Sequence, residues 1–163
     1  MVSIGEKIRR AVRCYEENGD MAHRHPVLSR FARELEERIR SSRKAMERLG
    51  VVAVCRSCEE EEGGSCCGAG IENRYGVGLL FINLMLGAEL PPQRLKPESC
   101  HFLGPRGCCL PARHVLCVNY LCGRLREGLG PEKTAALQKV AGEELDCLFR
   151  FHETLKKILS PQP

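Results

Sequence analysis

Cysteine is the residue type whose placement in this chain points to chemistry. All but Cys14 and Cys147 of the 11 cysteines lie between residues 55 and 122. Thiols that served only as small core residues would be scattered along the chain, so this clustering indicates a metal site. The two outlying cysteines fall in helical patterns and are predicted to pack as apolar side chains. The clustered ones are Cys55-x2-Cys58-x7-Cys66-Cys67, Cys100-x7-Cys108-Cys109 and Cys117-x4-Cys122.

The spacing of the first four thiols supports this interpretation. A Cys-x2-Cys turn lets two thiolates converge on one ion while backbone N–H groups donate to the sulfurs. Glycines surround the following pair, Cys66-Cys67, and permit close backbone approach. Adjacent cysteines in an extended chain point to opposite sides. The pair therefore either serves two centres or is turned inward together by a glycine-assisted bend.

The later cysteines are harder to assign to one centre. Cys117 and Cys122 are five residues apart, about 140° around an ideal helix, so both face one centre only if a helix starts after Cys117. Of the next adjacent pair, we predict that Cys108 is a ligand and that Cys109 is structural. Arg113 is predicted to lie beside the centre and to offset thiolate charge through N–H donors to sulfur.

The pattern of residues 55–122 resembles the YkgJ-like cysteine-cluster family, whose members are described as zinc- or iron-chelating. The resemblance rests on Cys55-x2-Cys58 followed by Cys66-Cys67, on Cys100-His101-Phe102-Leu103, and on Cys108 to Cys122 with Arg113 between them. The chain departs from the family in the longer gap before Cys66 and in His114, where proline usually follows the arginine. By position, the resemblance implies eight metal ligands: Cys55, Cys58, Cys66, Cys67, Cys100, Cys108, Cys117 and Cys122.

What the resemblance implies is a cofactor class, zinc or iron with an iron–sulfur cluster included, and no particular reaction. His101 and His114 lie near the cysteines, but eight thiols already suffice as ligands. The sequence therefore predicts a metal-binding protein with a redox or metal-handling role, and a metallochaperone or metal store fits equally. No catalytic residue is assigned. The partners expected are a metal ion and an unidentified protein.

A thiol–disulfide oxidoreductase that uses Cys55 and Cys58 is the alternative. That chemistry needs the Cys-x2-Cys motif to open a helix within a βαβ pattern, and the glutamates and glycines that follow offer no such helix. A nucleic-acid-binding zinc module is disfavoured, because a second Cys-x2-Cys pair and interleaved aromatic residues are missing from the sequence. The formal charge of +4 is weak evidence for a nucleic-acid partner. Eight thiolates with two divalent ions would change it by −8 + 4 = −4, to about zero.

Length and composition predict one domain over residues 1–163, with N-terminal helices in 1–50, the cysteine region in 55–122 and a C-terminal helix in 131–160. The charged N-terminus has no apolar signal-peptide core. The longest apolar stretch, 77–86, has only about half of the roughly 20 residues needed to cross a bilayer. A cytoplasmic chain without a membrane span is expected, in a reducing compartment where clustered thiols are more often ligands than disulfides.

The fold class expected is mostly α, a helical bundle with an irregular cysteine-rich metal-binding region. Ser3-Ile4-Gly5-Glu6 has the form of a capping box, which predicts a helix over 3–18 that ends at Asn18-Gly19. An apolar stripe of 3.6-residue period predicts a second helix from Pro26 to Gly50. The run 51–54 is interpreted as a short strand or an extended lead-in, and 59–64 as a solvated, flexible loop.

Further along, the nearly continuous apolar character of 72–86 predicts a helix in the centre of the bundle. Proline and glycine make 87–112 irregular. Two more helices are expected, over 113–126 and from Pro131 onward. Among the histidines, His152 is predicted to be a core residue, and His23 and His25 to have a capping or solvent role.

Overall fold

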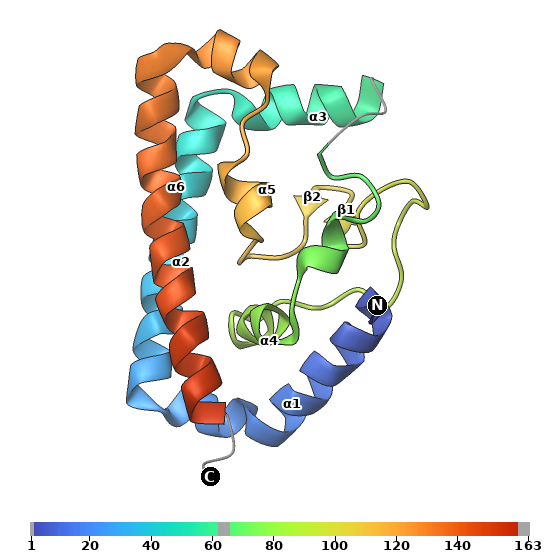
Figure 1. Cartoon of the computed structure of the whole chain (residues 1–163), viewed down its shortest axis with the longest axis vertical. Coiled ribbons are helices and arrows are strands. Elements are labelled where there is room, and N and C mark those ends of the chain that lie inside the picture. Colours follow the sequence, from blue (N-terminus) through green and yellow to red (C-terminus); the bar gives the residue numbers. More distant parts are fainter. Residues whose placement is uncertain (1, 62–65, 160–163) are drawn as a thin grey trace.

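The computed structural model describes residues 2–61 and 66–159 and is mostly helical (Figure 1). A single antiparallel pair of two-residue strands is the sheet found in that part of the chain. The predicted mostly α fold class is therefore confirmed. In chain order, the elements are α1 (Ile4–Arg24), α2 (Pro26–Arg48), α3 (Val51–Glu61), the 3₁₀ helix η1 (Ile71–Arg74), α4 (Val77–Met85), β1 (Leu103–Gly104), β2 (Gly107–Cys108), α5 (Val115–Asn119) and α6 (Gly123–Leu159).

Helix α1 begins as the capping box predicts, because the Ser3 side chain accepts a hydrogen bond from the Glu6 backbone N–H at 3.2 Å. The predicted end at residue 18 is wrong, since the helix continues to Arg24. Gly19 is a packing residue rather than a stop: a Cβ there would lie 3.0 Å from the Tyr15 ring. The turn into α2 is capped by His25, whose Nδ1 accepts from the Val27 backbone N–H at 3.3 Å, as the capping role predicted.

Helices α2 and α6 run antiparallel along one side of the molecule (Figure 1). Phe31 stacks on Phe151 with ring centroids 5.8 Å apart, and Arg38 pairs with Glu143 at 2.8 Å. The second helix and the helix from Pro131 are both confirmed. Because Gly130 has a φ of 73°, α6 is broken there, and a first short piece from Gly123 precedes the long one.

Helix α4 packs between this pair and α1, with Phe81 and Ile82 fully buried in the main apolar core. The predicted start at residue 72 is wrong. Gly70 has a φ of 108°, η1 ends at Arg74, and the helix starts only after Gly76. His152 of α6 is half-buried and lies directly over Gly78, where a Cβ would be 2.3 Å from the imidazole Nε2.

The main apolar core also contains the two outlying cysteines. Cys147 is fully buried, and Cys14 is half-buried and packs against the same cluster. Their predicted role as packing residues is confirmed.

The first cysteines lie on a helix rather than on an extended segment. Gly50, with a φ of 75°, ends α2, and α3 starts at once with Val51 buried against Ala45 and Met46. The expected strand or lead-in over 51–54 is therefore wrong, because burial of Val51 is satisfied by a helical turn. The solvated loop expected over 59–64 is wrong for residues 59–61, which belong to α3, and residues 62–64 lie outside the described residues.

Residues 87–112 are irregular, as predicted, apart from β1 and β2, where Leu103 pairs with Cys108. The helix expected over 113–126 is two pieces, α5 and the start of α6, separated by residues 120–122. Within 2–61 and 66–159, no helix has both the length and the apolar character that a membrane span requires.

Candidate metal centre

The eight predicted ligand cysteines fall into two neighbouring sets when they are sorted by which thiols affect one another. Burial raises the pKa of Cys55, and Cys66, Cys122 and Cys58 raise it further. We call these four the outer group. Burial likewise raises the pKa of Cys67 to about 12, with contributions from Cys108, Cys117 and Cys100 and a smaller one from Cys55 of the outer group. We call Cys67, Cys100, Cys108 and Cys117 the inner group.

The outer group is assembled by α3 and two segments distant from it in sequence. Cys55 and Cys58 are three residues apart on α3, Cys66 follows the undescribed residues 62–65, and Cys122 lies between α5 and α6. Cys55 and Cys66 are exposed, and the other two are partly buried. Burial and then the Cys122 and Cys58 thiols raise the pKa of Cys66, with a smaller contribution from Cys117, so neighbouring sulfurs disfavour the Cys66 thiolate.

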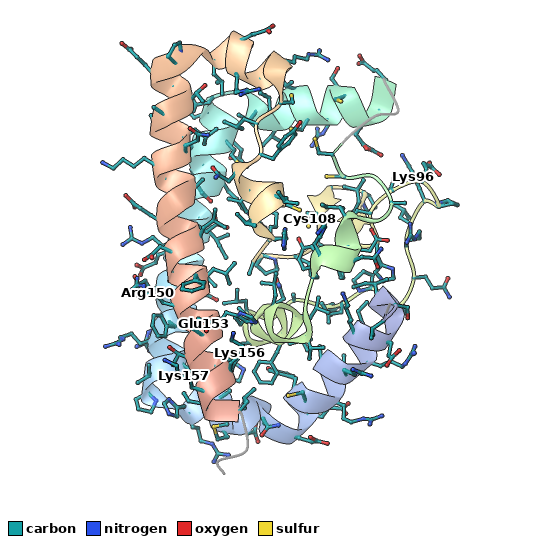
Figure 2. The ribbon with its side chains drawn as sticks, in the orientation of Figure 1. Lys96, Cys108, Arg150, Glu153, Lys156 and Lys157 are labelled. Carbon is teal, nitrogen blue, oxygen red and sulfur yellow. The ribbon has the colours of Figure 1, made fainter. Side chains whose placement is uncertain are left out.

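The inner group is assembled by backbone pairing. The Cys100 N–H donates to the Cys67 carbonyl oxygen at 2.6 Å, beside a bridge between Gly68 and Ser99. Cys108 is held by β2, and Cys117 lies on α5. All four pack against one apolar cluster, and Figure 2 shows Cys108 near the middle of the molecule. Burial raises the pKa of Cys100 to about 11, so the thiol is protonated at neutral pH.

The adjacent cysteines are thereby separated. Cys66 is affected chiefly by outer thiols and less by Cys117, whereas Cys67 is affected chiefly by inner thiols and less by Cys55. Whether the pair serves two centres stays a prediction. Cys117 and Cys122 also fall in different groups. The condition that a helix start after Cys117 is not met, because α5 begins at Val115 and already contains Cys117.

Cys109 is assigned to neither group, although the neighbouring Cys108 thiol adds to the burial that raises its pKa. Its backbone N–H donates to the Phe102 carbonyl oxygen at 2.9 Å, while its side chain is exposed. The structural role predicted for Cys109 is therefore carried by its backbone and not by a packed thiol.

Tyr75 is a neighbour of the inner group that the sequence interpretation missed. Its hydroxyl donates to the Cys117 Sγ at 3.8 Å and accepts from the His114 backbone N–H at 3.1 Å. The ring is 1% exposed and packs on Phe102, with centroids 5.0 Å apart. A hydroxyl donor favours the thiolate, and it partly offsets the burial that raises the pKa of Cys117. Nothing in the sequence distinguishes Tyr75 from an ordinary core tyrosine.

Arg113 faces both groups, as its predicted role requires. Burial raises the pKa values of Cys55, Cys108 and Cys117, and the Arg113 guanidinium acts against each rise. Its terminal nitrogen donates to the Met46 sulfur at 3.5 Å, and its Nε is buried without a hydrogen-bond partner in the part of the chain that the structure describes. A guanidinium in this position is suited to offset the negative charge of bound thiolates.

A second guanidinium, Arg43, comes from α2. It donates to the carbonyl oxygens of Leu110 at 2.9 Å and Pro111 at 3.3 Å, and it also counteracts the raised pKa of Cys108. No such role was predicted for Arg43, whose side chain is exposed. Arg43 lies four residues after Ile39 of the apolar stripe, and this spacing could have indicated that its side chain contacts the rest of the protein.

Two polar side chains fix the loops that carry the inner cysteines. Asn83 on α4 donates to the Ala112 carbonyl oxygen at 2.9 Å and accepts from the Ala112 N–H at 2.9 Å, which holds the residue before Arg113. Glu72 is 1% exposed and accepts from the Gly70 N–H at 2.7 Å and from Arg94 at 2.5 Å. Burial alone would raise the pKa of Glu72, but the backbone donors and Arg94 outweigh it and lower this pKa.

The two histidines near the cysteines have other hydrogen bonds. The His101 Nε2 lies 2.8 Å from the Pro91 carbonyl oxygen. The His114 Nδ1 accepts from the Leu116 N–H at 3.3 Å and caps α5. Each bond uses one ring nitrogen of its histidine.

The donor chemistry fits a soft metal, but the coordination geometry is not formed. All 11 cysteines are free thiols. Within residues 2–61 and 66–159, no three or more His, Cys, Asp or Glu side chains converge closely enough to hold a metal ion. The chain thus gathers the thiols into two neighbourhoods, and a closer approach of the sulfurs is needed for ligation.

Comparison with known proteins adds no relative: no protein-family model, no curated protein and no solved structure matches this chain. Its function is therefore argued from its own residues.

Proposed function

We propose that this chain is a metal-binding protein of the YkgJ-like kind, with zinc or an iron–sulfur cluster held by the outer and inner groups of thiols. The observation that supports the proposal is the mutual effect of the sulfurs. Three thiols of the outer group raise the pKa of Cys55, and three of the inner group raise that of Cys67. When neighbouring sulfurs disfavour ionisation, a cation among them stabilises the thiolate forms.

The second support is the positive charge behind the sulfurs. Four thiolates on one divalent ion leave a net charge of −4 + 2 = −2 at each centre, which is costly in a partly buried site. Arg113 faces Cys55, Cys108 and Cys117, and its buried Nε has a hydrogen to donate. With Arg43 it supplies the compensating charge that a thiolate-bound metal needs.

The role of the centres depends on the metal. Bound zinc would hold four thiolates in a closed site, whereas an iron–sulfur cluster would carry an electron. In either case the chain's own residues perform the same tasks: Tyr75 donates its hydroxyl to the Cys117 sulfur, and Glu72 with Arg94 holds the loop that leads to Cys100.

The oxidoreductase alternative has weaker support. A nucleophilic cysteine is activated by a lowered pKa, commonly at a helix N-terminus. Cys55 is the fifth residue of α3, and burial and neighbouring thiols raise its pKa. Both features favour a ligand over an attacking thiolate.

The deciding experiment is anaerobic purification of the full chain with measurement of zinc, iron, labile sulfide and visible absorption. We expect either about two zinc per chain, one for each four-sulfur site, or iron with sulfide and a charge-transfer band. A variant with all eight cysteines replaced by serine should lose the metal. The matched control is the double variant Cys14→Ser and Cys109→Ser, which should keep it.

Two pairs of adjacent single variants test the ligand assignment. Cys66→Ser and Cys67→Ser should each lower the metal content by about half, because each removes a ligand from a different four-sulfur site. Cys108→Ser should do the same, while its neighbour Cys109→Ser should not. Metal retained by the eight-serine variant, or no metal in the native chain, would refute the proposal.

A further inference from the structure

We infer that Glu144 of α6 sets how tightly the chain holds its metal, because this buried carboxylate offsets the positive charge of Arg43, which lies beside the Cys108 thiol. This inference rests on the proposed function and concerns the regulation of affinity at the same site. It requires only that Cys108 is one of the ligands, whether the thiols form one centre or two.

Glu144 lies between α2 and α6, in an interface that is otherwise largely apolar. Both Glu144 and Ser42 are fully buried. The Ser42 hydroxyl donates to the Glu144 Oε2, while the other carboxylate oxygen, Oε1, has no hydrogen-bond partner within residues 2–61 and 66–159. A buried carboxylate with an unpaired oxygen costs stability, and an apolar pair would join the helices better. The charge itself is therefore the feature to explain.

Arg43 connects this carboxylate to the cysteine-bearing loops. It follows Ser42 on α2, and although part of its side chain is exposed, its terminal nitrogen reaches into the protein. That nitrogen donates to the carbonyl oxygens of Leu110 at 2.9 Å and Pro111 at 3.3 Å, just beyond Cys108. The guanidinium is thereby held between α2 and the loop that carries the thiol.

The charged neighbours of Arg43 come from three parts of the chain. Burial and then Arg113 lower the pKa of Arg43. The Cys108 thiol, Glu144 and Glu47 act in the opposite direction. Glu47 is exposed, where water and salt screen its charge, so Glu144 is the carboxylate with the larger effect on this guanidinium.

The charge of Glu144 should weaken metal binding. Thiolates around a metal are stabilised by nearby positive charge and destabilised by nearby negative charge. Arg43 supplies the first and Glu144 the second, so the affinity of the centre lies below the value that Arg43 alone would give. A moderated affinity suits a metal-handling role, because a bound ion can then be passed on.

The test is the zinc affinity of the full chain at a fixed neutral pH, measured by competition with a chromogenic zinc chelator. Glu144→Gln keeps the size of the side chain and removes its charge. We expect zinc binding to become tighter by about tenfold, the order expected when one charge is removed near a partly buried site. A defect in folding or packing would weaken binding, so the direction of the change separates the two explanations.

Two variants are matched controls. Glu143→Gln removes the same charge from the next residue of α6, where the carboxylate is 46% exposed and pairs with Arg38, and it should leave the zinc affinity at the native value. Glu144→Asp keeps the charge on a shorter side chain. It should lower stability and leave the zinc affinity near the native value.

The opposite substitution tests the other half of the pair. Arg43→Gln should weaken zinc binding, and the double variant of Arg43→Gln with Glu144→Gln should return to near the native affinity, because the two charges offset one another. Circular dichroism and urea unfolding of the metal-free chain check that each variant folds. If Glu144→Gln does not fold, Glu144→Met removes the same charge without placing an amide in the apolar interface, and the same tightening is expected.

For an iron–sulfur cluster, the reduction potential measures the same effect. Reduction adds negative charge to the centre, so Glu144→Gln should raise the potential and Glu143→Gln should leave it unchanged. A potential that does not move in Glu144→Gln would contradict the role given to this carboxylate.

Equal or weaker zinc binding in a folded Glu144→Gln chain would overturn the inference and leave the proposed function intact. Equal tightening in Glu143→Gln would also overturn it, because the effect would then belong to the net charge of the chain. A native chain that binds neither zinc nor iron would overturn both proposals.

Discussion

The helical frame and the cysteine-bearing segment of this molecule are held together by different forces. In the frame of α1, α2, α4 and α6, buried apolar side chains such as Leu28, Leu35 and Phe151 form one continuous core. In residues 66–122, the loops depend on polar side chains, among them Glu72 and Asn83, that bond to backbone groups. The frame draws its stability from burial, which needs no ligand, whereas the segment combines a smaller apolar cluster around Tyr75, Phe102 and Leu110 with directional bonds and with what the thiols bind.

This comparison implies that the two regions respond differently to metal. Substitutions in the frame should cost the same free energy of unfolding with and without a chelator. Substitutions in the segment should cost more when metal is present, because they then also weaken the metal-bound state.

The largest loss of stability is expected for Phe151→Ala in the helical frame. The ring is fully buried and stacked on Phe31, so its removal leaves a cavity and should lower the free energy of unfolding by about 3–5 kcal/mol. Urea unfolding followed by circular dichroism measures it. Phe149→Ala, at a 63% exposed position on the same helix, is the control and should change little. If the loss in free energy of unfolding disappears when metal is removed, the frame depends on metal as the cysteine-bearing segment does.

The next effect is expected at the junction of the two regions, for Asn83→Ala. The Ala112 N–H and carbonyl groups lose their partner in a buried place, which should cost about 1–3 kcal/mol for each group left unpaired. Because Ala112 precedes Arg113, metal content should fall as well. Asn119→Ala, at an exposed position on α5, serves as the control. Lower stability with unchanged metal content would show that Asn83 does not position the metal-binding residues.

A smaller effect is expected for Tyr75→Phe, which keeps the ring and removes the hydroxyl. Loss of the bonds to the Cys117 sulfur and the His114 N–H should cost about 1–2 kcal/mol of stability. It should also weaken the inner centre by about 10–100-fold, the usual effect of removing a hydrogen-bond partner of a ligand. Competition with a zinc chelator measures the affinity. Tyr120→Phe, where the side chain is 58% exposed, should match the native chain.

The smallest effect is a shift in pH dependence, for Arg113→Gln. Burial raises the pKa of Cys55, Cys108 and Cys117, and Arg113 opposes it, so without the guanidinium these pKa values should rise further. Metal competes with protons for the thiolates. The pH at which half the metal is bound should therefore move upward, by up to about one unit, or about 1.4 kcal/mol.

A pH titration of metal content measures the shift, with Arg106→Gln at an exposed position as control. A downward shift, or equal shifts in both variants, would contradict the role given to Arg113.

Much of the frame could be predicted because its causes are local. The capping box sets the start of α1, and an apolar stripe with Pro26 and Gly50 at its ends sets α2. The misplaced boundaries arise where a tertiary contact overrides a local preference. Gly19 stays helical because the Tyr15 ring occupies its face, and 51–61 becomes a helix because Val51 finds a buried place beside α2.

For the candidate site, the sequence alone establishes the reactive groups: nine clustered thiols, eight of them predicted ligands, two adjacent pairs that suggest two centres, and Arg113 among them. Only the tertiary structure decided which thiols are neighbours, and it brought in Tyr75, Asn83 and Arg43 from elements whose patterns describe packing. The reason is physical. Helix periodicity is encoded within a few residues. A group of four thiols instead requires that segments as far apart in sequence as Cys55 and Cys122 come together, and no local pattern specifies this.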